Sequence, residues 1–159
     1  MPFAPAEMTL TSSVFPPEGP IPVQYTGEGD DLSPPLAWES PPKGTQGFAI
    51  FCLDPDAPLV SPDGNCGFVH WVLYNLPESV RSLDEATPEG TPGLNNFDKI
   101  GYGGPLPPPA HGTHRYYFWV VALDKELDLL EGLSLWEFLK EAEPHILGMS
   151  RLVGTYQRK

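Results

Sequence analysis

Short apolar runs separated by Gly, Pro, Asp and Ser are the main pattern along this chain, and such runs are typical of β-strands. In Val69–Asn75 and Arg115–Leu123, both the odd and the even positions are mostly apolar, so both faces of each strand would be apolar. This pattern predicts central strands covered on both faces. No internal repeat or linker divides the chain, which indicates a single domain over residues 1–159. The predicted strands are Met8–Ser13, Gly47–Leu53, Val69–Asn75, Arg115–Leu123 and a stretch within Ile146–Tyr156.

One helix is predicted late in the chain. Ser134 and Glu137 have the spacing of a capping box, in which the Ser hydroxyl accepts from the Glu amide and the Glu carboxylate accepts from the Ser amide. Pro144 stops the apolar pattern, so the helix covers about 135–143. The chain is therefore predicted to be mostly β, with one or two late helices.

The composition joins many turn-forming residues to many aromatic ones: 21 Pro and 16 Gly beside 4 Trp, 6 Tyr and 8 Phe. Because each proline fixes its own φ angle, long loops rich in proline are expected to be ordered. Long ordered loops in a compact domain are usually functional. The candidate loops are Thr26–Pro42, Asp54–Gly67, Asn95–Gly104 and Pro105–Thr113.

The formal net charge is −12, and all of it lies in the first part of the chain, where fourteen acidic residues precede position 99 against only Lys43 and Arg81. An acidic surface without a Lys/Arg cluster disfavours nucleic acid and an anionic membrane surface as partners. The acidity is interpreted as a contribution to solubility.

No targeting segment is found in the sequence. The start, MPFAPAEMTL, has neither a basic region nor an apolar core typical of a leader, and the longest apolar run, Tyr116–Leu123, is too short to span a bilayer. Cys52 and Cys66 are too few for a disulfide framework. We therefore expect a cytoplasmic protein with free thiols and no stable membrane insertion.

Two acidic residues separated by a proline form the first candidate site. Asp54 and Asp56 directly follow a predicted strand, and His70 opens the next one. Both carboxylates could simply cap turns, which is common chemistry for Asp beside Pro. With His111 and His114 these residues also supply metal-ligating side chains, but no short metal-binding spacing joins them, so no metal site is predicted.

The second candidate site is the segment from Gly101 to Tyr116. Gly101, Gly103 and Gly104 could turn successive amides toward one point, which predicts an anion-binding nest. His114 follows at the start of the aromatic strand. In the alternative interpretation the histidines of this segment only hydrogen-bond to backbone carbonyls.

Catalytic interpretations find little support in the sequence. It contains no Gly-x-Ser-x-Gly elbow and no Walker loop, and nothing nominates a base for Ser33. A His–Asp pair could perform acid–base chemistry, but no nucleophile accompanies it. Binding is therefore favoured over catalysis, and no cofactor is predicted.

An ordered set of motifs resembles the phosphatidylethanolamine-binding protein family, in its bacterial and archaeal Raf-kinase-inhibitor-like branch. The resemblance covers nearly the whole chain. It rests on Tyr25-Thr-Gly-Glu-Gly, Leu32-Ser-Pro-Pro-Leu, Asp54-Pro-Asp-Ala-Pro58, His70, Asn95-Asn-Phe, the segment Gly101–Tyr116, and Leu152-Val-Gly-Thr-Tyr156.

The resemblance implies a β fold of two antiparallel sheets with a small anion pocket at one end. The family's ligands are phosphoryl head groups, and other small anions can occupy the pocket. By motif match, the ligand-binding residues implied here are Asp54, Asp56, His70, Gly104, Pro105, Pro108, His114 and Tyr116. The match assigns the whole Gly104–Pro108 loop to the pocket and does not distinguish Pro107, Pro108 and Pro109.

Three hypotheses about function follow from these observations. The first is a non-enzymatic module that binds a phosphoryl group or other small anion and modulates or inhibits a protein partner. The second is a protease or kinase inhibitor that acts through a loop surface away from the pocket, and competition between phosphate analogues and the partner separates the two. The third is a small hydrolase or lyase on the same scaffold. A homodimer is left open, because nothing in the sequence specifies one.

Overall fold

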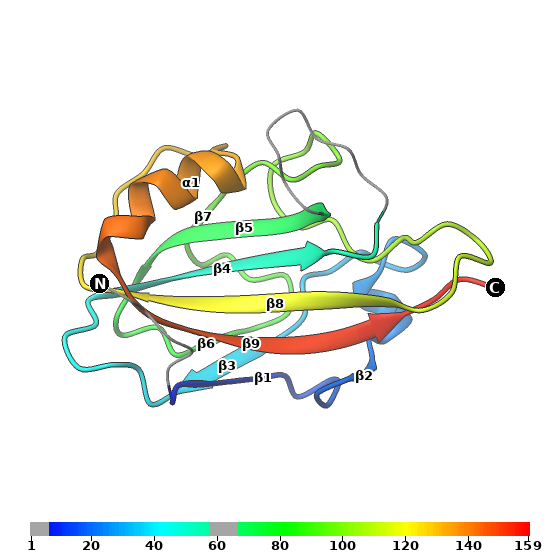
Figure 1. Cartoon of the computed structure of the whole chain (residues 1–159), viewed down its shortest axis with the longest axis horizontal. Coiled ribbons are helices and arrows are strands. Elements are labelled where there is room, and N and C mark those ends of the chain that lie inside the picture. The colour runs from blue at the N-terminus through cyan, green and yellow to red at the C-terminus, as the bar shows by residue number, and fades with distance from the viewer. Residues whose placement is uncertain (1–6, 58–66) are drawn as a thin grey trace.

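Two β-sheets form the framework of this computed structural model, which describes residues 7–57 and 67–159. The strands are β1 (Thr9–Thr11), β2 (Gly19–Pro20), β3 (Leu36–Glu39), β4 (Gly47–Asp54), β5 (Phe68–Pro77), β6 (Ser82–Leu83), β7 (Thr91–Pro92), β8 (His114–Leu123) and β9 (Ile146–Tyr156). Six form a large sheet in the order β2-β9-β8-β4-β5-β7, and β1-β3-β6 form a small one (Figure 1). The predictions of a mostly β chain and of two sheets are confirmed.

The large sheet has apolar side chains on both faces. The small sheet covers one face, where Trp38 of β3 meets Phe48 of β4 edge to face at 5.4 Å between ring centroids. Helix α1 (Leu135–Ala142) covers part of the other face, where Phe138 stacks on Tyr74 of β5 at 5.5 Å. Strand β4 lies between these two layers, and its near-continuous apolar sequence follows from burial on both faces.

The prediction of strands covered on both faces holds for β5 and only for half of β8. Six consecutive residues of β5, from Val69 to Tyr74, are buried. In β8 the prediction is wrong at the beginning, because Arg115 is exposed and Tyr117 and Trp119 are half-buried. An eight-residue helix is about 12 Å long, so it cannot cover a ten-residue strand of about 33 Å. Arg151 of β9 lies over both aromatic rings, at 5.6 Å from each centroid.

The helix prediction is confirmed, including its cap. The Ser134 hydroxyl accepts from the amide of Glu137 at 3.2 Å, and the Glu137 carboxylate accepts from the amide of Ser134 at 2.9 Å. A short 3-10 helix, Glu143–His145, follows and leads into β9. Among the described residues, no helix has the length and apolar character needed to cross a membrane.

Two parts of the architecture differ from the prediction. Strand β3, Leu36–Glu39, lies within the segment predicted as a loop, because its two buried residues, Leu36 and Trp38, alternate inward onto the core. The pairing of β2 with β9 is parallel, whereas the other strand pairs are antiparallel. The free thiol of Cys52 is buried, and burial raises its pKa well above the usual value. Cys66 lies outside the described residues.

We expect the capping box to be worth about 1 kcal/mol of stability, since replacing an N-cap Ser by Ala typically costs that much. Ser134→Ala should therefore lower the free energy of unfolding by about 1 kcal/mol in urea denaturation. Ser134→Asp is the matched control, because its carboxylate also accepts from the Glu137 amide and should preserve stability. Equal stability of Ser134→Ala and the parent chain would contradict this role.

Candidate functional site

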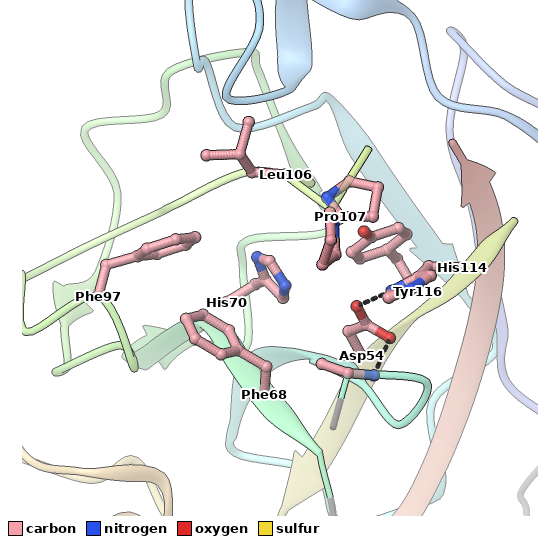
Figure 2. A pocket seen from close by; sticks show the side chains of 10 residues that line it. Asp54, Phe68, His70, Phe97, Leu106, Pro107, His114 and Tyr116 are labelled. Atoms are coloured by element: carbon pink, nitrogen blue, oxygen red, sulfur yellow. Dashed lines mark hydrogen bonds and ion pairs between the residues drawn. The ribbon is translucent and has the colours of Figure 1, made fainter. Parts of the chain in front are cut away.

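A pocket of about 190 Å³ lies at the end of the large sheet where β4 finishes and where β5 and β8 begin (Figure 2). Its polar groups come from these three strands, and its apolar residues come mostly from the loops around them. The residues that line it are Asp54, Ala57, Phe68, His70, Phe97, Leu106, Pro107, Pro108, His114 and Tyr116.

The floor of the pocket holds a buried carboxylate–imidazole pair. Nδ1 of His114 lies 2.7 Å from Oδ2 of Asp54, and both side chains are almost inaccessible, at 2% and 3% exposure. Since a carboxylate only accepts, His114 donates from Nδ1. The other oxygen of Asp54, Oδ1, accepts from the amides of Asp56 and Ala57, so the turn-capping interpretation of this residue is confirmed.

Asp56 makes a second link between the segment after β4 and the start of β8. Its Oδ2 accepts from the backbone amide of Arg115 at 2.8 Å, one residue beyond His114. The segment Asp54-Pro-Asp56 therefore binds the start of β8 twice, once through an imidazole and once through an amide. Asp56 is not among the residues that line the pocket.

His70 faces the pocket in a defined tautomer. Its Nδ1 lies 2.6 Å from the carbonyl oxygen of Gly103, and because a carbonyl only accepts, Nδ1 carries the proton. Burial lowers the pKa of His70 below its usual value, against the opposing effect of the Gly103 carbonyl, so the ring is neutral near pH 7. Its Nε2 then presents a lone pair to the pocket and not a donor.

Tyr116 supplies a donor with nothing to bind. Its hydroxyl is fully buried and makes no hydrogen bond of ordinary length and angle among the described residues, although the Asp54 carboxylate lies close to it. Burial, followed by the negative charge of Asp54, raises the pKa of Tyr116 far above its usual value, so the hydroxyl keeps its proton. The ring of Tyr116 meets that of His70 edge to face at 5.1 Å between centroids and is inclined by 27° to that of His114 at 6.4 Å. A buried donor in a pocket wall is a group that a ligand can satisfy.

The upper walls are apolar. Phe68 meets Phe97 at 4.6 Å and His70 at 4.9 Å between ring centroids, and Leu106 is 42% exposed at the rim. Such walls lower the local dielectric and strengthen any hydrogen bond made on the floor. Leu106 and Pro107 belong to the Gly104–Pro108 loop that the family resemblance assigned to the pocket, whereas Phe97 was not predicted to line it. The Asn95-Asn-Phe motif was the available signal for Phe97.

The predicted glycine nest is wrong. The amide of Gly101 donates to the carbonyl of Gly93, that of Gly103 to the carbonyl of His70, and that of Gly104 to Oδ1 of Asp31 at 2.7 Å. These amides therefore fix the loop and leave none for an anion. Gly104 and Pro105 lie outside the lining set, whereas Pro108 is within it.

His111 extends the buried pair to the surface. Its Nδ1 lies 2.7 Å from Nε2 of His114, so a side chain and not a backbone carbonyl holds this ring. Asp54, His114 and His111 form a continuous chain of hydrogen bonds from the pocket floor outward. In the described part of the chain, no three His, Cys, Asp or Glu side chains are grouped as metal ligands would be.

Five of the eight predicted site residues meet in the pocket. They are Asp54, His70, Pro108, His114 and Tyr116. The other three make hydrogen bonds to neighbouring segments. Asp56 Oδ2 accepts from the amide of Arg115, the Gly104 amide donates to Oδ1 of Asp31, and the Pro105 carbonyl accepts from the amide of Gly27. Ligand binding by these eight residues stays a prediction.

The chain matches a family model and is similar to known proteins over most of its length. The family model described as phosphatidylethanolamine-binding protein matches residues 11–157. The UPF0098 protein of Methanothermobacter thermautotrophicus is 38% identical over 95% of this chain and 99% of its own length. The chain belongs to the phosphatidylethanolamine-binding protein family.

Solved structures of bacterial proteins agree with this membership. A protein of Chlamydia trachomatis described as a putative phosphatidylethanolamine-binding protein homologue is 36% identical, with a TM-score of 0.85 over 96% of this chain and 98% of that one. An Escherichia coli protein described as a new member of the mammalian family is 27% identical, with a TM-score of 0.86 over 97% of this chain and all of that one. The predicted family and its representation in bacteria and archaea are thus confirmed.

We expect Tyr116→Phe to stabilise this family member. An unsatisfied buried polar group costs about 1–3 kcal/mol, so removing the hydroxyl should raise the free energy of unfolding by about 1 kcal/mol. Tyr74→Phe is the matched control, because the buried Tyr74 hydroxyl donates to the Leu130 carbonyl and accepts from the Leu133 amide. That variant should lose about 1–2 kcal/mol. If urea denaturation finds both variants destabilised alike, the Tyr116 hydroxyl is not unpartnered.

Proposed function

We propose that this chain is a non-enzymatic binding module for a phosphoryl group or another small anion, and that it acts in the cytoplasm by modulating or inhibiting a protein partner. The observation that supports this most is the buried, unpartnered hydroxyl of Tyr116 in the pocket wall. An anionic oxygen placed there would accept from it in an apolar surrounding, where a charge-assisted hydrogen bond is strong. The name of the family supports the phosphoryl class of ligand.

The composition of the pocket also supports binding over catalysis. The Asp54–His114 pair resembles the orienting half of a catalytic triad. Yet none of the lining residues within the described ranges is Ser, Thr, Cys or Lys, so none of these four nucleophilic side chains faces the imidazole in that part of the chain. His70 is neutral near pH 7 and Asp54 is an acid, so these two residues supply no positive charge to a ligand.

The same charges restrict which anions fit. The Asp54 carboxylate repels a dianion more strongly than it repels a singly charged phosphodiester or a protonated phosphomonoester. A protonated monoester can also donate to Nε2 of His70 and accept from Tyr116. A zwitterion such as phosphoethanolamine adds an ammonium group that the carboxylate of Asp54 attracts.

The first test is a titration of isotopically labelled protein with phosphoethanolamine and with inorganic phosphate, followed through the ring resonances of the histidines. We expect saturable shifts at His70 and His114, with His145 unaffected because it pairs with Asp124 outside the pocket. Tyr116→Phe should weaken binding about tenfold, the usual value of one charge-assisted hydrogen bond. Absence of saturable shifts with either ligand would overturn the proposal.

Binding should strengthen as the pH falls. The free His70 is neutral near pH 7, and an anion beside Nε2 favours its protonated form, so the bound state holds more protons than the free state. Affinity for dimethyl phosphate, which does not itself titrate near neutrality, should rise by up to about tenfold per pH unit between about pH 8 and about pH 6.

His70→Gln and His145→Gln are the matched variants for this pH dependence. A glutamine amide donates without taking up a proton, so His70→Gln should flatten the pH profile of the association constant. His145→Gln should leave the profile unchanged, because His145 lies outside the pocket. Isothermal titration calorimetry in buffers of different ionisation enthalpy measures the proton uptake directly. A profile that is flat in the parent chain would contradict the assignment of the proton to His70.

A further inference from the structure

The hydrogen-bond chain on the pocket floor leaves His114 no free polar atom. An imidazole has two ring nitrogens, and in His114 the first is held by Asp54 and the second by His111, each at 2.7 Å. The His114 ring nevertheless lines the pocket and is only 2% exposed. A ligand that is to hydrogen-bond His114 must therefore replace one of these two partners.

His111 is the partner that a ligand can replace. Asp54 is buried and also accepts from two backbone amides, so its release would leave a buried charge without its imidazole partner. His111 is exposed, and its ring meets His114 edge to face at 5.0 Å between centroids. Loss of the bond to His114 leaves no buried polar atom on His111 without a partner, because water can solvate the departing ring.

The backbone around His111 is built to turn sharply. Ala110 and Gly112, on either side of it, have φ angles of 59° and 89°. A Cβ atom placed on Gly112 would meet nothing within 4 Å, so this position is open to solvent. The turn is anchored on both sides of His111: the Ala110 amide donates to the Arg158 carbonyl, and the Thr113 hydroxyl donates to Oε1 of Gln157. The freedom of His111 therefore belongs to its side chain and not to the loop as a whole.

The charged groups around this chain leave the His111 ring without a second ionic partner. Asp56 is engaged with the Arg115 amide, and the Arg115 side chain pairs with Glu18. Arg158 pairs with Glu28. The other ionisable groups that face His114 are Asp54 and the protonated Tyr116. The bond to His114 is therefore the one polar contact recorded for the His111 ring among the described residues.

The bond between the two imidazoles holds one proton. Either Nδ1 of His111 donates to Nε2 of His114, or a His114 imidazolium donates to a neutral His111. Two protons would set two N–H groups against each other. In both permitted forms the Nε2 atom of His114 is unavailable to a ligand.

We propose that His111 is the gate of the pocket: it occupies Nε2 of His114 in the free protein and is displaced when an anionic ligand binds. This inference rests on the proposed function. After displacement, the form in which the shared proton lies on Nε2 of His114 donates it to the ligand, while Asp54 holds Nδ1. His111 thus lowers affinity and excludes ligands that bind too weakly to break its bond.

The experiment compares three variants with the parent chain, using dimethyl phosphate as the probe. His111→Ala removes the competing bond and should tighten binding about five- to tenfold, because one hydrogen bond no longer has to be broken. His111→Phe keeps a ring of similar size without nitrogen and should bind as tightly as His111→Ala. His145→Ala removes another histidine that is bonded to an acid, and should bind like the parent chain.

A second readout observes the bond itself. In free protein labelled with nitrogen-15, we expect a coupling between Nδ1 of His111 and Nε2 of His114 through the hydrogen bond, and saturation with dimethyl phosphate should abolish it. Binding with this coupling intact, or weaker binding by His111→Ala, would overturn the gate and leave the proposed function standing. His111→Phe binding like the parent would show steric covering and overturn the hydrogen-bond gate. Failure of every form, His111→Ala included, to bind any phosphate probe would overturn the proposed function and the gate with it.

Discussion

A buried carboxylate at the end of one strand and a buried imidazole at the start of its neighbour hold the pocket end of this protein together. Asp54 is the last residue of β4 and His114 is the first residue of β8. The 2.7 Å bond between their side chains holds the end of β4 against the beginning of β8. Removing two such groups from water is costly, and apolar replacements of similar volume often stabilise a protein. The pair therefore contributes position more than stability. Around it, the amides of Asp56, Ala57 and Arg115 find their acceptors.

The pocket that results has an unusual balance of donors and acceptors. Its floor holds a carboxylate, a neutral imidazole whose tautomer the Gly103 carbonyl selects, and an unpartnered Tyr116 hydroxyl. Apolar walls from Phe68 and Phe97 lower the local dielectric, so a hydrogen bond to any of these groups is stronger than it would be in water. The charge of the pocket, the direction of its hydrogen bonds and the polarity of its walls thus depend on different residues, so each property can be changed by a separate substitution.

The sequence predicted those features that depend on local spacing. The capping box of Ser134 and Glu137 predicted a helix that the structure confirms, and motif order brought Asp54, His70 and His114 to one pocket. Features that depend on distant partners were beyond it. The glycine nest failed because the Gly104 amide finds an acceptor in Asp31, seventy-three positions earlier. Strand β3 was missed because four residues between prolines carry too short a pattern. The bond from His111 to His114 depends on a loop conformation that composition does not encode.

The short helix gives the large sheet two ends of different character. Where α1 packs, Val121 and Leu123 of β8 are sealed from water. Nearer the pocket, Tyr117 and Trp119 are half-buried, with the side chain of Arg151 over both rings. Opening free energies within one domain range from near zero up to that of global unfolding, and the sealed segments are the last to exchange their amide protons. The helix end therefore behaves as the rigid anchor of the molecule. Around the half-buried Tyr117 and Trp119 we expect amide protons to exchange sooner than at the helix end, through local openings that leave the core beneath α1 folded.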